Sequence, residues 1–185
     1  MTMATTERYL DPEKILSHLT LKPGMRVGDF GVGGEAFYAI PIGKRVGQSG
    51  EVYLFDIVKN ALGSAMSMMQ IHGLKNAKAV WSNLEMFEGA RGIGKNSLDA
   101  GALISVLSQS QKPKDILAEL QRMLKVGSQL LVVDWHPSTE LGFAPDKRRR
   151  LAAERVEQLA RDLGFATQEA FEAGPHHWGL VFVKT

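Results

Sequence analysis

The chain contains no cysteine among its 185 residues, which excludes disulfides, thiolate metal sites and cysteine nucleophiles. It also lacks any apolar run near the roughly 20 residues that a membrane-spanning helix needs. The N-terminal segment MTMATTERYLDPEK has no apolar core of the kind that a secretory signal carries. The formal net charge is only +2, too small by itself to indicate nucleic-acid binding. We therefore expect a cytoplasmic protein with no membrane partner.

Hydrophobic residues make up 44% of the sequence and charged residues 23%, as in ordinary globular proteins. A chain of this length buries roughly 70% of the surface that its unfolded form exposes, enough for one sizeable core. No repeat or long linker interrupts it. The sequence therefore predicts a single domain over residues 1–185.

Helical and strand patterns alternate along the whole chain, which predicts an α/β fold. Only the short segment 173–176 separates the last two predicted strands, so that pair must be antiparallel, because a parallel pair needs a crossover of a dozen or more residues. The predicted strands span residues 25–30, 51–55, 77–81, 98–104, 129–134, 167–172 and 178–183. The predicted helices span residues 11–19, 35–46, 58–71, 113–124 and about 147–163.

The most basic segment is the run from Lys147 to Arg150, which we expect to open the last helix. Leu151, Val156, Leu159 and Leu163 fall on one face at helical spacing. The arginines therefore belong on or beside the solvated face, although such a run also keeps RNA open as a partner.

A glycine-rich turn at residues 31–34 joins the first predicted strand to the next helix, expected from Glu35. Glycines here let the backbone approach a ligand, and the helix beyond presents free N–H groups. Asp56, at the carboxyl end of the second predicted strand, is placed to accept hydrogen bonds from a ribose diol. Together these features predict a nucleoside pocket.

Two cofactors compete for this pocket. Gly31, Gly33 and Ala36 satisfy the loose dinucleotide pattern with alanine in third place. Asp29 opposes it, because a carboxylate there repels a pyrophosphate and instead suits the ammonium of an amino-acid moiety. This favours S-adenosylmethionine, while a glycine turn that merely packs helix on strand is the non-functional alternative. A nucleotide-dependent oxidoreductase would need a hydride-handling group such as a tyrosine-lysine pair, and we find none.

Four segments resemble successive motifs of the class I S-adenosylmethionine-dependent methyltransferases, over about residues 21–135: LKPGMRVGDFGVGGEAF, KRVGQSGEVYLFDI, SLDAGALIS and LKVGSQLLVVDW. The closing GPHHWGLVFVK resembles the final hairpin strand of small bacterial members. The resemblance implies a Rossmann-like seven-stranded, mostly parallel sheet with an antiparallel C-terminal strand and helices on both faces. It also implies an N-terminal helical lid over residues 1–20 with Tyr9 and Leu10, a cofactor-binding core over 21–135, and a C-terminal helix and hairpin over 136–185.

The resemblance assigns S-adenosylmethionine as the cofactor, with S-adenosylhomocysteine as its product. Glu35 stands where the family usually has a third glycine, and it either crowds the loop or points outward at the helix start. Asn83 stands where an aspartate often accepts a bond from the adenine amino group, which an asparagine carbonyl can also accept. The residues assigned to cofactor binding are Asp29, Phe30, Gly31, Val32, Gly33, Glu35, Asp56, Ile57, Asn83, Leu84 and Ser105.

Methyl transfer from a sulfonium is an in-line displacement that mainly needs alignment and exclusion of water, so no catalytic triad is expected. Asp134 and His136, after the fifth predicted strand, are the candidates for a base. The alternatives are a loop-ordering carboxylate for Asp134 and a surface-loop residue for His136. The aromatic residues Phe37, Tyr38 and Trp135 either wall the pocket or belong to the core.

Adjacent residues in a regular strand point to opposite faces, so His176 and His177 cannot readily share a metal ion, and we assign none. The predicted function is methyl transfer from S-adenosylmethionine to an acceptor, expected to be a small molecule. A cofactor-binding protein without catalysis and an RNA methyltransferase are the alternatives. The sequence gives no indication of oligomeric state.

Overall fold

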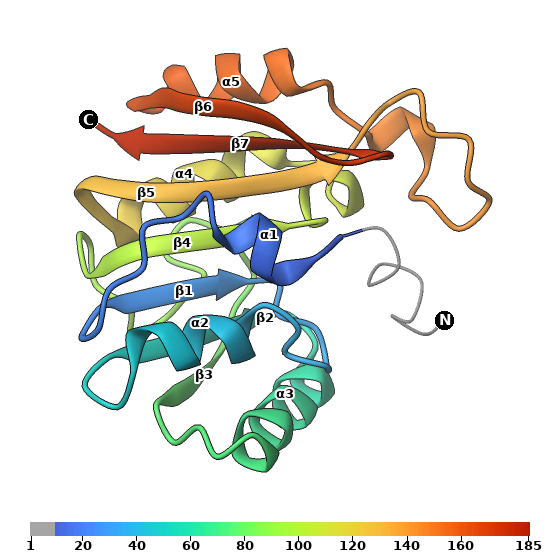
Figure 1. The fold of residues 1–185 in the computed structure, drawn as a ribbon. Coiled ribbons are helices and arrows are strands. Elements are labelled where there is room, and N and C mark those ends of the chain that lie inside the picture. Colours follow the sequence, from blue (N-terminus) through green and yellow to red (C-terminus); the bar gives the residue numbers. More distant parts are fainter. Residues whose placement is uncertain (1–9) are drawn as a thin grey trace.

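The computed structural model describes residues 10–185, and within them seven strands form one sheet (Figure 1). The strands are β1 (Arg26–Phe30), β2 (Glu51–Asp56), β3 (Ala77–Trp81), β4 (Leu98–Ile104), β5 (Leu124–Trp135), β6 (Phe165–Gly174) and β7 (His177–Lys184). Their order across the sheet is β3-β2-β1-β4-β5-β7-β6. Every neighbouring pair is parallel except those of β7, which runs antiparallel to β5 and β6. The predicted α/β fold with an antiparallel C-terminal strand is confirmed.

Helices cover both faces of this sheet. They are α1 (Pro12–Leu16), α2 (Ala39–Val46), α3 (Lys59–Ile71), α4 (Pro113–Met123) and α5 (Ala153–Arg161), with short 3-10 turns η2 (Leu107–Gln109) and η3 (Lys147–Arg149). Apolar residues of α1, α2 and α3 pack with one face of the sheet, and those of α4 and α5 with the other. Side chains along each strand point alternately to the two faces, so one strand contributes to both core clusters. In β1, Val27 belongs to the first cluster and Phe30 to the second. In the described part of the chain, no helix has the length and apolar character needed to span a membrane.

The first helix begins as its sequence predicts. The Asp11 side chain accepts hydrogen bonds from the amides of Glu13 and Lys14, at 3.0 and 3.4 Å, and Pro12 takes the first helical position. Leu10, one of the two predicted lid residues, is buried in the core cluster beside this helix. Tyr9, the other, lies outside the described residues.

The helix expected from Glu35 starts four residues later, at Ala39, so that prediction was wrong at its beginning. Gly31, Gly33 and Ala36 have positive φ values of 84°, 63° and 52°, which prolong the turn because left-handed residues cannot enter a right-handed helix. A start at Ala39 also places Pro41 in the first turn, where its missing N–H costs nothing. Glu35 is consequently part of the turn and does not meet the helix dipole.

The last helix was also predicted too long. The basic run forms η3, whose first turn is capped by Asp146 through the Arg148 amide at 3.0 Å. The chain is then extended at Arg150, whose guanidinium donates to the carbonyls of Thr139 and Pro145. Trp178 Nε1 donates to the Leu151 carbonyl at 2.9 Å. These bonds hold a break between η3 and α5, so the basic run does not lie on the amphipathic helix.

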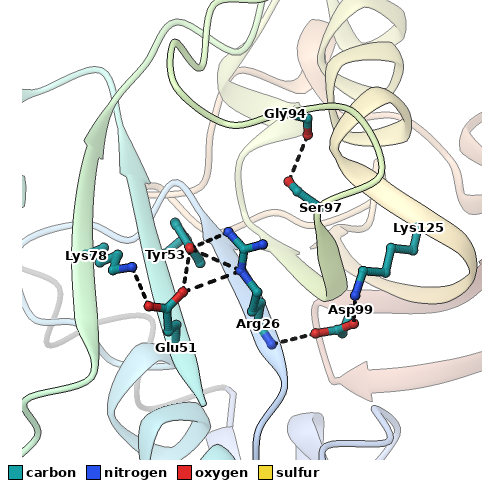
Figure 2. Close-up of polar contacts among 8 residues, drawn as sticks. All are labelled: Arg26, Glu51, Tyr53, Lys78, Gly94, Ser97, Asp99 and Lys125. Atoms are coloured by element: carbon teal, nitrogen blue, oxygen red, sulfur yellow. Dashed lines mark hydrogen bonds and ion pairs between the residues drawn. The ribbon is translucent and has the colours of Figure 1, made fainter. Parts of the chain in front are cut away.

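Polar side chains at the amino ends of the parallel strands are paired with one another (Figure 2). Arg26 Nη2 donates to the Tyr53 hydroxyl at 2.6 Å, and that hydroxyl donates to Glu51 at 2.6 Å. Glu51 also binds Lys78 from β3. Farther along the edge, Asp99 accepts from the Arg26 amide at 2.8 Å and from Lys125 Nζ at 2.5 Å. This edge therefore joins five neighbouring strands by bonds that are made within the chain.

Candidate functional site

The opposite edge of the sheet, at the carboxyl ends of the parallel strands, holds buried polar atoms without a hydrogen-bond partner. Among the described residues these include Asp29 Oδ2, Tyr38 Oη, Ser82 Oγ, Ser105 Oγ and both ring nitrogens of His177. Asn76 Oδ1 also has no hydrogen-bond partner, but it does not lie at this edge. The side-chain nitrogen of Asn76 donates to the carbonyls of Gly43 and Gly47. Buried polar groups are normally paired, so their concentration at one edge indicates a place where a ligand supplies the missing partners.

A cavity of about 690 Å³ opens at this edge, within the roughly 300–1,000 Å³ range of small-molecule sites. Phe37 and Tyr38, two of the three aromatic residues considered as pocket walls, also line it, whereas Trp135 does not. Of the eleven residues predicted to bind the cofactor, nine line the cavity: Asp29, Gly31, Val32, Gly33, Asp56, Ile57, Asn83, Leu84 and Ser105.

Phe30 and Glu35 are the two predicted cofactor residues that do not line this cavity. Phe30 has no exposed surface and stacks on Phe55, with ring centroids 4.7 Å apart, in the core cluster on the other face of the sheet. Glu35 instead lines a separate hollow of about 300 Å³, together with Pro12 and Lys44. Glu35 therefore does not crowd the larger cavity.

The glycine turn is held in place by the end of β2. The amides of Gly31 and Val32 both donate to the Phe55 carbonyl, at 2.8 and 3.0 Å, and the Gly33 amide donates to Asp56 Oδ2 at 3.0 Å. A Cβ atom at Gly31 would stand 2.5 Å from Val106 Cγ2. Glycine is thus required at this position both by its positive φ and by the close approach of the loop after β4.

Asp56, at the end of β2, connects the glycine turn with the start of α3. Its Oδ2 accepts from the Gly33 amide, and its Oδ1 accepts from the Val58 amide at 2.8 Å, at the start of α3. Each carboxylate oxygen has a further lone pair. The side chain can therefore fix the glycine turn and still accept hydrogen bonds from a diol.

Asp29 is 3% exposed, and its Oδ2 atom has no partner. Burial raises the pKa of this carboxyl to about 7, with a further increase from the charge of Asp56, while the Ala39 amide acts in the opposite direction. The nearby Tyr38 hydroxyl is also unpartnered, and burial together with the charge of Asp29 raises its pKa. A cationic donor placed beside Asp29 would supply the missing partner and stabilise the ionised carboxylate.

At the other end of the cavity, Asn83 Oδ1 accepts from the Glu85 amide at 3.0 Å. Its second lone pair remains available to an adenine amino group. Leu84 is buried and Ile57 is 56% exposed, so the two apolar side chains border this end at different depths. Ser82, which the sequence reasoning missed, lies in the same wall. Ser82 directly follows β3 as Ser105 directly follows β4, so its position after a parallel strand is a signal that could have found it.

The two candidates for a base lie outside the cavity lining. Asp134 is 2% exposed, and it accepts from the amides of Ser108 at 3.2 Å and Trp135 at 2.7 Å. Burial raises its pKa, although these hydrogen bonds oppose the shift. His136 Nε2 lies 2.9 Å from Glu172 Oε2 on β6. Each residue thus has the contacts that its non-catalytic interpretation expects: Asp134 orders the turn at η2, and His136 sits in a surface loop.

No group of three histidine, aspartate or glutamate side chains in residues 10–185 could hold a metal ion. His177 is buried, and neither of its ring nitrogens has a hydrogen-bond partner. The carbonyl of the neighbouring His176 accepts a hydrogen bond from the His136 amide at 2.8 Å. Trp135 packs beside His177, with ring centroids 4.0 Å apart.

Comparisons with known proteins agree with this geometry. A family described as a methyltransferase domain matches residues 21–173. A SAM dependent methyltransferase from Aquifex aeolicus superposes with a TM-score of 0.86 at 26% sequence identity, covering 98% of this chain and 94% of that one. No sequence among the curated proteins matches the chain.

Two more distant structures share the fold alone. The cyclase SpnF has a TM-score of 0.77 at 15% identity, covering 94% of this chain and 79% of its own. A protein from Pyrococcus horikoshii OT3 has a TM-score of 0.73 at 13% identity, covering 94% and 87%. Because a shared fold does not fix the reaction, the assignment depends on the site and on the family match.

Proposed function

Because the chain belongs to the class I S-adenosylmethionine-dependent methyltransferases, we propose that its cavity binds this cofactor and that the methyl acceptor is a small molecule. The observation that carries the proposal is the Asp29 carboxylate, buried and with one oxygen unpartnered beside the glycine turn. The ammonium of the cofactor is a donor of the kind that this oxygen lacks.

The residues around the cavity fit the rest of the cofactor. Asp56 is positioned for the ribose hydroxyls, and Asn83, Leu84 and Ile57 for the adenine. Gly31 and Gly33 leave room for the part of the cofactor that joins its ammonium to its ribose, because neither glycine has a side chain to occupy the turn. When bound, the sulfonium supplies a methyl group that is already activated for displacement.

The protein's own contribution is alignment and exclusion of water. Asp29 would bind the ammonium and Asp56 the ribose hydroxyls, and Ser105, at the end of β4, lines the same cavity. Tyr38 and Phe37 wall the cavity near Asp29. We propose that residues 1–20 act as a lid on this side, in a single domain with the core at 21–135 and the C-terminal helix and hairpin at 136–185.

A small acceptor is supported by the state of the basic run. Lys147 pairs with Glu140 and Arg148 with Asp146, while Arg150 is bonded to backbone carbonyls of its own loop. Arg150 thus holds the loop before α5, and Lys147 and Arg148, which stay exposed, are each paired with a carboxylate that offsets their charge. RNA is the alternative, and it predicts binding that weakens steeply with salt. If no RNA binding is measured at any salt concentration, that alternative is excluded.

The test is calorimetric titration with S-adenosylmethionine, S-adenosylhomocysteine and NADH, on the wild type and on Asp29→Asn. We expect micromolar binding of the two sulfur ligands, at least tenfold weaker in the variant, and no binding of NADH. Asp115→Asn, an exposed aspartate of α4, is the matched control. Failure of both sulfur ligands to bind the wild type would refute the proposed function. Binding without methyl transfer to any small acceptor would favour the non-catalytic alternative.

A further inference from the structure

His177, the first residue of β7, is an unpartnered buried group that the cofactor site does not use. Its side chain has no exposed surface, and neither ring nitrogen has a hydrogen-bond partner in the described structure. Buried polar groups in folded proteins are normally hydrogen-bonded. Asp29 and Ser105, which are unpartnered at the same edge, line the cofactor cavity, whereas His177 does not.

The strand registers place His177 beside the methyl-donor end of that cavity. Ile104 of β4 pairs with Val133 of β5, and Trp135, two residues on, pairs with His177. Side chains two residues apart share a face of the sheet, and both Ile104 and Val133 belong to the core cluster on the face of α1, α2 and α3. The cavity wall at Ile104 therefore continues over Trp135 to His177 along one face and one edge.

The ring contacts around His177 are aromatic. The Trp135 ring lies at 49° to the imidazole, and Phe143 meets Trp135 edge-on at 6.0 Å. Burial lowers the pKa of His177 to about 4, with smaller contributions from His176 and His136. A neutral imidazole has one N–H donor and one nitrogen lone pair.

We propose that His177 and Trp135 form the acceptor subsite of the methyltransferase, and that the acceptor is an uncharged molecule with a hydroxyl group on a flat apolar body, as in a phenol. A hydroxyl can donate its proton to the ring nitrogen that carries the lone pair. On methyl transfer its oxygen would form the new bond to the methyl group, the bond from that methyl to the sulfonium would break to leave S-adenosylhomocysteine, and the hydroxyl proton would pass to that nitrogen. A carboxylate would use only the N–H and would add a buried charge, while an ammonium has no lone pair with which to accept a methyl group. The indole and the Phe143 ring suit an aromatic body. This inference depends on the proposed function for its role in methyl transfer.

Entry to the subsite requires movement of the segment at residues 137–146, which contains no helix or strand. Within it, Phe143 packs on Trp135, and Thr139 Oγ1 donates to the His176 carbonyl at 3.2 Å. Arg150 anchors the segment at the carbonyls of Thr139 and Pro145, so the movement that admits an acceptor falls on residues 140–144, which include Phe143.

The test follows the histidine ring nitrogens by NMR in ¹⁵N-labelled protein, with and without saturating S-adenosylhomocysteine. The probe is p-cresol, and the matched control is 4-methylanisole, which has the same ring but no hydroxyl proton. The His177 signals are identified by their loss in His177→Phe, or in His177→Gln if the first variant does not fold. We expect p-cresol to shift these signals, and 4-methylanisole, whose oxygen can accept but not donate a hydrogen bond, to shift them less.

Affinity for p-cresol should fall at least tenfold in His177→Phe and remain unchanged in His72→Phe, an exposed histidine at the end of α3. S-Adenosylhomocysteine should bind all these proteins equally. An unchanged His177 signal, or equal shifts with both probes, would overturn the inference while cofactor binding still supported the proposed function. A His177 response in a protein that does not bind S-adenosylhomocysteine would leave the subsite standing and refute the proposed function.

Discussion

Asp29 lowers the stability of the fold above neutral pH because its carboxyl is buried. Its pKa is about 7 in the folded protein, compared with 3.8 for the free side chain. The folded state therefore holds a proton that the unfolded state has lost between these values, and stability falls as the pH rises through this window. We expect Asp29→Asn to be more stable than the wild type above pH 7, by at most about 4 kcal/mol, and equal to it below the unfolded pKa. Urea unfolding across pH would measure this, and a difference that does not depend on pH would contradict it.

Binding of S-adenosylmethionine should show the opposite dependence on pH. The ammonium is attracted to Asp29 only when the carboxyl is ionised, so affinity should rise from about pH 6 to about pH 7.5. In Asp29→Asn the affinity should be weaker and nearly independent of pH over that range. Calorimetry in matched buffers would check this prediction, and a persisting slope in the variant would assign the pH dependence to another group.

Neighbouring residues of one motif can serve different purposes. Asp29 and Phe30 were both predicted to bind the cofactor, but a strand directs adjacent side chains to opposite faces. Asp29 lines the cavity, whereas Phe30 packs in the second core cluster. The alternation was visible in the sequence. This alternation could have assigned Asp29 to the site and Phe30 to the core before the structure was known, whereas the motif alone could not.

At the scale of elements, the glycine turn can be tested by two matched substitutions. Gly31 and Gly47 both have positive φ, but a Cβ at Gly31 would meet Val106 at 2.5 Å, while one at Gly47 would meet nothing within 4 Å. We expect Gly47→Ala to cost about 1–3 kcal/mol of stability, from its positive-φ backbone alone, with no loss of cofactor affinity. Gly31→Ala should cost more and should weaken cofactor binding at least tenfold. Equal effects in the two variants would show that the contact with Val106 is unimportant.

The loop before α5 depends on Arg150 more than on the other residues of the basic run. Arg150 donates to two backbone carbonyls, whereas the exposed Arg148 pairs with Asp146 alone. Arg150→Ala should therefore cost about 1.5–3 kcal/mol and make residues 137–150 easier to cleave. Arg148→Ala should cost much less, because water screens an ion pair at an exposed position. Limited proteolysis and thermal unfolding would compare them, and similar cleavage rates would refute this assignment.

Element boundaries were predictable where side-chain pattern decides them. The predicted limits of β3 and β4 agree with the structure, because apolar runs and flanking turns define both. The start of α2 was missed, because it depends on the left-handed backbone at Ala36, a residue type that rarely adopts it. The break before α5 was missed because it is made by a long-range bond from Trp178 and by bonds from the Arg150 side chain to backbone carbonyls of its own loop, neither of which the helical spacing reveals.

For the whole molecule, cofactor binding should appear as added thermal stability. A ligand at 100 times its dissociation constant stabilises the folded state by about 2.7 kcal/mol, which for a chain of this size raises the melting temperature by roughly 5–10 °C. We expect this increase with S-adenosylhomocysteine and none with NADH. Differential scanning fluorimetry would measure it, with Asp29→Asn as the variant in which the increase is reduced. An equal increase with NADH would contradict the choice of cofactor.

The architecture as a whole followed from the alternation of helix and strand patterns and from the short final hairpin. The same patterns did not show which buried polar atoms would have hydrogen-bond partners. Which buried atoms lack partners depends on how strands that are distant in sequence line up, and His177 comes next to Trp135 only through the register of β5 and β7.

The reversed direction of β7 also determines how the protein can be handled in experiments. Because β7 starts at the edge that holds the cavity, it ends at the opposite edge, where Lys184 Nζ is bonded to Asn96, Gln121 and Leu124 and Thr185 is exposed (Figure 1). A sensor surface or an affinity tag attached after Thr185 would therefore leave the cavity mouth directed toward the solution. Immobilisation at that end is the orientation in which ligand binding would be least obstructed.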